Sequence, residues 1–206
     1  MRAIFLLGFS IFLVAMPLNA QSATKQNAPP TKKPERSFIG EVPTSIAASV
    51  GETLQFVEGE FLGVAEAMPE EKYDFVPTIG KFDDARTFRE QVKHVACVQF
   101  ALFNEFEGKQ PPPLCERGGP SSAKTKAELI QYLKESFDYG NGVMSQLTAA
   151  NSLDRVDGRY AAPTTKLGIS VASIWHVTDH YGQLVEYLRM NGIVPPLTQK
   201  YGVKVR

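Results

Sequence analysis

The sequence lacks an excess of charge of either sign. Its 206 residues hold 22 lysines and arginines against 22 aspartates and glutamates, so the formal net charge at pH 7 is zero. A protein that binds nucleic acid through its phosphates normally carries a basic stripe or patch. The balanced charge therefore predicts neither a nucleic-acid partner nor electrostatic attachment to an anionic membrane surface.

Several catalytic motifs are also missing. The chain contains no G-x-S-x-G nucleophile elbow, no phosphate-binding P-loop and no glycine fingerprint for dinucleotides. No segment shows the sustained alternation of apolar and polar residues that is typical of a half-buried strand. These absences argue against the enzyme classes that depend on those motifs, and they favour an all-α fold.

Cysteine and histidine are scarce, with two and three residues respectively. The cysteines are Cys97 and Cys115. In an exported chain the two could form one disulfide. In the alternative interpretation, Cys97 is a small core residue and Cys115 is an unrelated loop thiol.

The amino terminus has the layout of a secretory signal peptide. Arg2 precedes an apolar run, Ile4–Met16, and a small residue, Ala20, ends the segment. The run is shorter than the ~20 residues that span a bilayer, so an uncleaved membrane anchor is the weaker alternative. We expect cleavage after Ala20, a flexible polar tether over residues 21–37, and a periplasmic or secreted protein without stable membrane insertion.

Four later segments place apolar residues three or four positions apart, which predicts amphipathic helices. Two of them open with a T-x-x-E capping box, in which the threonine and the glutamate cap each other's backbone N–H groups. Pro69 stops the first segment, and Asn191 and Gly192 stop the last. The segments run from Thr44 to Pro69, from Thr87 to Gly108, from Thr125 to Leu147, and from Thr164 or Thr165 to Asn191.

Four helices of this length, each ~30 Å long, predict a four-helix bundle over residues 38–196, followed by a tail over residues 197–206. The Pro/Gly-rich stretch between residues 108 and 124 is longer than a tight helical hairpin needs. It could run the length of the bundle and make the second and third helices parallel. Trp175 and Tyr181 are expected to pack between helices.

Two of the three histidines, His176 and His180, are four residues apart in the last predicted helix. Side chains at this spacing share one helix face and can converge on one cation. His94, in the second helix, can supply a third nitrogen across the bundle core. The alternative is that each histidine is a surface or hydrogen-bonded core residue. The pattern is not the zinc-protease H-E-x-x-H, because Val177 stands where that motif has its glutamate.

Three blocks, AEAMPEEKYDFVPT, RTFREQVKHVA and HVTDHYGQLVEYLRMNGIVPP, resemble the DinB-like family in content, order and spacing. The resemblance covers most of the chain from Thr44 to Pro196. It implies a four-helix bundle of up-down-down-up topology and a divalent metal held by one histidine on the second helix and two on the fourth. These positions correspond to His94, His176 and His180. Some relatives are thiol S-transferases, and the better-known relatives are cytoplasmic, unlike a chain with a signal peptide.

Three further residues on the last helix are candidates for the pocket or its support. Gln183 could position a metal-bound water, Asp179 could accept an imidazole N–H from His94 or His176, and Tyr187 could line the pocket. The alternatives are, in order, a hydrogen-bonded helix contact, a solvated surface acid and core packing.

Two functions remain open from the sequence. The first is a metal-dependent enzyme acting on a small molecule by thiol transfer or hydrolysis, and the second is a metal-containing binding or structural protein without turnover. Three imidazoles suit Zn, Ni, Fe or Cu, and Zn is our default. A homodimer is compatible with either function.

Overall fold

A computed structural model describes residues 42–202 of the chain. The predicted signal peptide (1–20) and tether (21–37) lie outside these residues, as does the end of the expected tail. The described residues all belong to one compact unit, Arg36–Arg206. Among them, no helix combines the length and the apolar character needed to cross a membrane.

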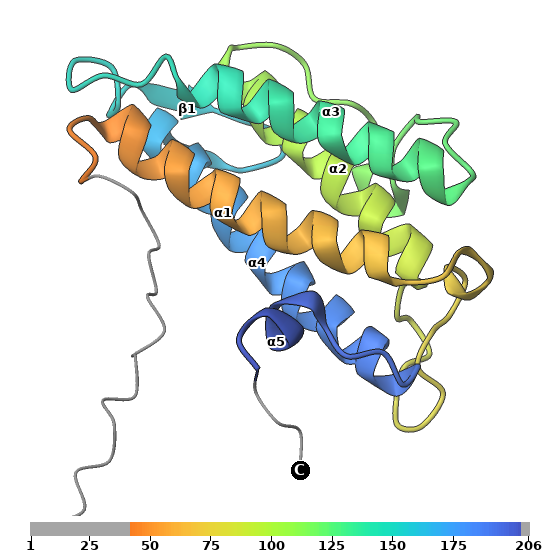
Figure 1. Cartoon of the computed structure of the whole chain (residues 1–206). Helices are drawn as coiled ribbons and strands as arrows, with labels where there is room; N and C mark the ends of the chain where they lie inside the picture. Colours follow the sequence, from red (N-terminus) through yellow and green to blue (C-terminus); the bar gives the residue numbers. More distant parts are fainter. Residues whose placement is uncertain (1–41, 203–206) are drawn as a thin grey trace, which may run out of the picture. The chain divides into compact units, whose positions relative to one another are not determined.

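Four long helices form the bundle, and their arrangement confirms the predicted all-α fold. In Figure 1, α1 and α4 run in one direction and α2 and α3 in the other, which is the up-down-down-up order. The chain between α2 and α3 returns along the length of the bundle, as the long connection requires. The helices are α1 (Ile46–Ala67), α2 (Phe88–Phe106), α3 (Lys126–Met144) and α4 (Lys166–Met190).

Helices α2 and α3 start at the capping boxes that the sequence predicted. Both capping boxes form, so Thr87 with Glu90 opens α2 and Thr125 with Glu128 opens α3. Thr165 caps α4 by accepting from the Gly168 N–H. These caps satisfy backbone donors that have no partner inside the helix.

Between the helices lies an apolar core to which all four contribute. Phe61 of α1, Phe103 of α2 and Phe137 of α3 have no exposed surface. Gly140 of α3 lies directly against the Phe103 ring, and a Cβ there would come within 2.6 Å of it. Glycine at this position therefore permits the close approach of α2 and α3.

Three features differ from the sequence-based expectation. Residues between α3 and α4 form a short antiparallel ladder, β1 (Arg155–Asp157) with β2 (Pro163–Thr165). Strands of three residues are too short to show a period in the sequence. The expected tail begins with a helix, α5 (Pro196–Lys200), that packs on α1 beside Gly63. Trp175 was wrongly placed between helices, since it is 68% exposed, whereas Tyr181 packs partly buried against the core.

Candidate metal centre

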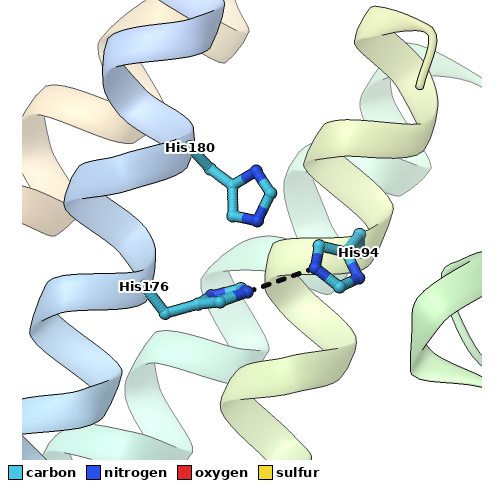
Figure 2. A group of neighbouring side chains, drawn as sticks. All are labelled: His94, His176 and His180. Carbon is cyan, nitrogen blue, oxygen red and sulfur yellow. Dashed lines mark hydrogen bonds between the residues drawn. The ribbon is translucent and has the colours of Figure 1, made fainter. Parts of the chain in front are cut away.

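The structure brings the three histidines together between α2 and α4. His94 projects from α2 toward His176 and His180, which lie one turn apart on α4 (Figure 2). One nitrogen from each ring lies within 4.8 Å of the other two. The His176 Nε2 and His94 Nε2 atoms are 3.2 Å apart. A group of this kind could hold a metal ion.

Burial keeps these imidazoles unprotonated. His94 and His180 are only 4% and 6% exposed. Burial, followed by repulsion from the neighbouring imidazoles, lowers the pKa of His176 to about 3 and that of His180 to about 4. The pKa of His94 is also lowered, again mainly by burial. Neutral imidazole is the form that binds metal, so the site is prepared for a cation near neutral pH.

A backbone carbonyl fixes the tautomer of His94. The Nδ1 atom of His94 lies 2.7 Å from the carbonyl oxygen of Cys115. A carbonyl only accepts, so Nδ1 carries the proton and Nε2 keeps a free lone pair. Nε2 is also the atom that faces His176. An imidazole with its second N–H bonded in this way is the usual arrangement of a metal ligand.

A chain of hydrogen bonds through two glutamine amides fixes the tautomer of His180, again with the proton on Nδ1. The Asp179 carboxylate can only accept, and it receives the Gln183 Nε2–H at 2.9 Å. Gln183 Oε1 then accepts from Gln91 Nε2 at 2.8 Å, which leaves Gln91 Oε1 to accept from His180 Nδ1 at 2.5 Å. Each amide orientation follows from its neighbour, so the charge on Asp179 leaves Nε2 of His180 unprotonated.

The donor set fits a divalent cation. Two nitrogens bound at about 2.0–2.1 Å to one tetrahedral zinc lie about 3.3 Å apart, close to the 3.2 Å between the two Nε2 atoms. Without an ion, His176 Nε2–H donates to the unprotonated His94 Nε2, whereas His176 Nδ1 is buried without a hydrogen-bond partner among the described residues and can take the ring proton when a cation binds Nε2. His176 is thus free to present Nε2 as a third donor. Three imidazoles also suit Ni, Fe or Cu.

Comparison with known proteins agrees with this geometry. A sequence model of the DinB superfamily matches residues 53–184, a range that includes all three histidines. The chain belongs to the DinB superfamily. The crystal structure of a DinB-like protein from Bacillus subtilis has a similar fold, with a TM-score of 0.53 and 18% identity over 70% of this chain and 92% of that one. At this identity the likeness concerns the fold alone. A comparison with curated protein sequences finds no match.

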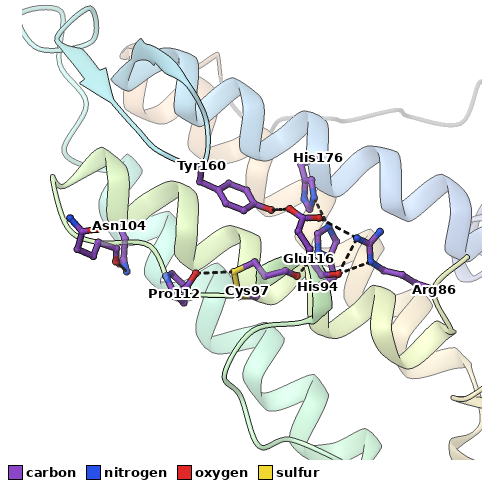
Figure 3. Close-up of a disulfide and its surroundings, with 10 residues drawn as sticks. Arg86, His94, Cys97, Asn104, Pro112, Glu116, Tyr160 and His176 are labelled. Carbon is purple, nitrogen blue, oxygen red and sulfur yellow. Dashed lines mark hydrogen bonds and ion pairs between the residues drawn. A yellow bond between two sulfur atoms is a disulfide. The ribbon is translucent and has the colours of Figure 1, made fainter. Parts of the chain in front are cut away.

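Beside the histidines of this DinB-superfamily chain lies a charged bridge built from three connecting segments (Figure 3). The Glu116 carboxylate accepts from Tyr160 Oη at 3.0 Å and from Arg86 at 3.3 Å. Arg86 also donates twice to the Glu116 carbonyl, at 3.2 and 3.1 Å. The Arg86 charge lowers the pKa of all three histidines, and the Glu116 charge raises those of His94 and His180, so both groups act on the centre.

The cysteines are joined, and the disulfide adjoins the metal centre. Cys97 of α2 and Cys115, the first residue of the short helix η2 (Cys115–Arg117), have Cα atoms 5.2 Å apart. A separation of this size suits a disulfide. Cys115 is also the residue whose carbonyl faces His94.

The three residues proposed from the sequence as pocket or supporting groups have more specific places. Gln183 bonds to Gln91 and Asp179 rather than facing the histidine nitrogens. Asp179 does not accept from His94 or His176, and it reaches only His180, through the two amides. Tyr187 lines a cavity of about 430 Å³ together with Gln91 and donates its hydroxyl to the Arg86 carbonyl at 2.8 Å.

Sequence reasoning missed Gln91, Arg86, Glu116 and Tyr160. Gln91 stands three residues before His94, so the two share a helix face, which is a weak signal. The other three lie in connecting segments, where no periodicity indicates which side chains will meet.

Proposed function

We propose that this chain is an exported metal-dependent enzyme whose divalent cation, Zn by default, is held by His94, His176 and His180. One observation carries the proposal. The Nε2 atoms of His94 and His176 are 3.2 Å apart, and hydrogen bonds at Nδ1 leave Nε2 unprotonated in both His94 and His180. Hydrogen bonds that leave Nε2 lone pairs available are expected of metal ligands, whereas packing alone does not require them.

The bound cation would act as a Lewis acid or lower the pKa of a coordinated water or thiol. Three protein ligands leave further coordination positions for a substrate. Glu116, which Tyr160 and Arg86 hold by hydrogen bonds, would accept a proton from the reacting group. Arg86 supplies a positive charge that favours an anionic substrate group beside the centre. These roles suit thiol transfer or hydrolysis of a small molecule.

The second candidate is a metal-containing protein without turnover. The near-complete burial of His94 and His180 favours it, because a substrate needs an approach to the ion. The cavity of about 430 Å³ lies beside Gln91 and Gln183, and no histidine lines it. A small-molecule ligand that binds the protein only when metal is present would support the enzyme.

Export is part of the proposal and has its own support. The amino-terminal residues 1–20 have the layout of a signal peptide. The Cys97–Cys115 disulfide also suits an oxidising compartment such as the periplasm or the extracellular space. Intact-mass analysis of the native protein should show Gln21 as its first residue. Full-length protein recovered from the cytoplasm would contradict export.

Metal analysis of protein purified from its own compartment tests the central claim. We expect one equivalent of a divalent metal, followed by turnover in a screen of thiol-transfer and hydrolysis substrates. The His176→Ala protein serves as the control and should show neither. Metal without any turnover would favour the second candidate.

A further inference from the structure

The disulfide lies in a connection that packs unusually closely on α2. Gly119 has φ +72°, and a Cβ there would come within 2.2 Å of the Cys97 sulfur. Gly118, with φ +84°, lies against the Lys93 side chain, where a Cβ would come within 2.8 Å. Residues 114–119, here called the clamp segment, therefore follow a path that only glycine allows at these two positions. The clamp segment thus packs closely on α2, and at Gly119 it packs against the disulfide itself.

Cys97 and His94 are three residues apart on α2, so they share one face of the helix. Across that face lies one residue, Cys115. Its sulfur bonds to Cys97, and its carbonyl accepts from His94 Nδ1 at 2.7 Å. The acceptor that sets the tautomer of a metal ligand is thus fixed covalently to the ligand's own helix.

The next residue, Glu116, extends this arrangement. Its side chain binds Tyr160 from the β1–β2 connection and Arg86 from the segment before α2. The clamp segment therefore links His94 to both groups that surround the centre (Figure 3). Release of Cys115 would remove the acceptor of His94 and loosen the charged bridge together.

We propose that the Cys97–Cys115 disulfide is a positioning element of the metal centre, which raises metal affinity by holding the Cys115 carbonyl against His94. This inference rests on the proposed metal binding. Reduction by two molecules of a monothiol such as glutathione breaks the S–S bond, leaves one thiol on each cysteine and joins the two reductant sulfurs in a new disulfide. The freed segment no longer fixes His94, so the affinity for metal falls.

A disulfide that served only the fold would behave differently. It would stabilise the folded state mainly by restricting the unfolded chain, and the folded protein would bind metal equally well without it. The decisive quantity is therefore the metal affinity of protein that is still folded. The second quantity is the equilibrium constant for reduction of the disulfide. If the disulfide raises metal affinity by some factor, thermodynamic linkage requires bound metal to favour the disulfide over the two thiols by the same factor.

The first experiment uses the exported protein with both cysteines replaced, Cys97→Ser with Cys115→Ser, so that no thiol can bind the probe. Zn²⁺ affinity is measured by competition with a chromophoric chelator, and circular dichroism of the same samples monitors the fold. We expect Zn²⁺ binding to weaken about 10–100-fold, as when the hydrogen-bond partner of a metal ligand is lost. Leu114→Ala, an exposed change in the same segment, is the control and should leave the affinity unchanged.

The second experiment does not depend on a variant that folds. Wild-type protein is equilibrated in glutathione redox buffers with and without saturating Zn²⁺, and free thiols are counted by mass after alkylation. Zn²⁺ should shift the reduction equilibrium by about the same 10–100-fold toward the disulfide. The inference is overturned if the folded double variant binds Zn²⁺ with wild-type affinity, or if Zn²⁺ does not change the reduction equilibrium. Neither result contradicts the metal site. A wild-type protein that binds no Zn²⁺ overturns both.

Discussion

The two faces of α2 differ in how they hold their neighbours. Toward α3 the contact is mainly apolar, with Phe103 against Gly140 and Phe100 stacked on Tyr132 and Tyr139 at ring distances of 5.5 and 5.6 Å. Toward α4 the same helix buries polar groups, among them Gln91, His94 and Gln99. Apolar contacts adapt to small shifts, whereas buried polar groups need partners in fixed directions.

The contrast indicates a division of labour. Burying a polar group without a partner costs free energy of folding. A helix face that buries several polar groups therefore indicates a functional site. Most buried polar atoms on the α4 side have partners, and Ser173 donates to Gln99 at 2.5 Å one layer away from the histidines. We infer that the α3 face mainly provides stability and the α4 face mainly provides the centre.

Loss of a histidine should have the largest effect on the centre and little effect on the fold. His94→Ala, His176→Ala and His180→Ala should each abolish stoichiometric metal binding, because one ion uses all three rings. Four long amphipathic helices that share one apolar core bury enough surface to fold without a cation. Metal content and circular dichroism are measured on the same samples.

Ser173→Ala, on the same face of α4 as His176, is the control for these variants and should retain metal. Stoichiometric metal with unchanged affinity in His94→Ala would refute the three-histidine site. Unfolding of any single variant would make the metal structural and would erase the proposed division between the two faces.

Truncation on the α3 face should do the reverse. Phe103→Ala removes a ring with no exposed surface, and we expect the free energy of unfolding to fall by about 3–5 kcal/mol. Protein that remains folded should bind metal with unchanged stoichiometry. Urea titration with and without Zn²⁺ measures both quantities. Metal loss from folded Phe103→Ala would mean that the two faces are coupled.

The sequence predicted the apolar face better than the polar one. Periodicity and the capping boxes at Thr87 and Thr125 located the helices, because these signals depend on neighbours in the chain. The spacing of His176 and His180 indicated one shared face, the position of His94 in the second helix offered a third nitrogen, and the family resemblance implied that all three hold one metal. A backbone carbonyl such as that of Cys115 has no signature in the sequence, since any residue supplies one.

Other features depended on tertiary structure alone. Glu116, Arg86 and Tyr160 come from three connections whose paths the sequence does not specify. The role of Gln91 follows from an amide orientation set by Gln183. Trp175 was expected to pack between helices and is nevertheless exposed, because the apolar pattern of the sequence does not say how wide the buried stripe is.

A change behind the ligands should have an intermediate effect. Gln91→Leu keeps the size of the side chain but removes the acceptor of His180 Nδ1, so the tautomer is no longer fixed. We expect Zn²⁺ affinity to fall about 10–100-fold with a folded protein. Gln99→Leu, a buried glutamine on the same helix that bonds to Ser173, is the matched control. Equal losses in the two variants would mean that the chain of hydrogen bonds to His180 has no specific role.

The smallest effect that we predict is a change in the pH dependence of metal-free protein. The pKa of His176 in the folded state is lowered to about 3 by burial, against ~6.5 in the unfolded chain. Between these values the unfolded chain binds the extra proton, so the free energy of unfolding falls as the pH falls below 6.5. A single histidine contributes at most about 1.4 kcal/mol per pH unit in this window. Urea titrations at pH 7.0, 6.0 and 5.0 should therefore give a flatter profile for His176→Ala than for the wild type, whereas Phe103→Ala should lower the profile without changing its slope. Parallel profiles for the wild type and His176→Ala would show that His176 is not held neutral, and the polar face would then lack the preparation for metal that separates it from the apolar one.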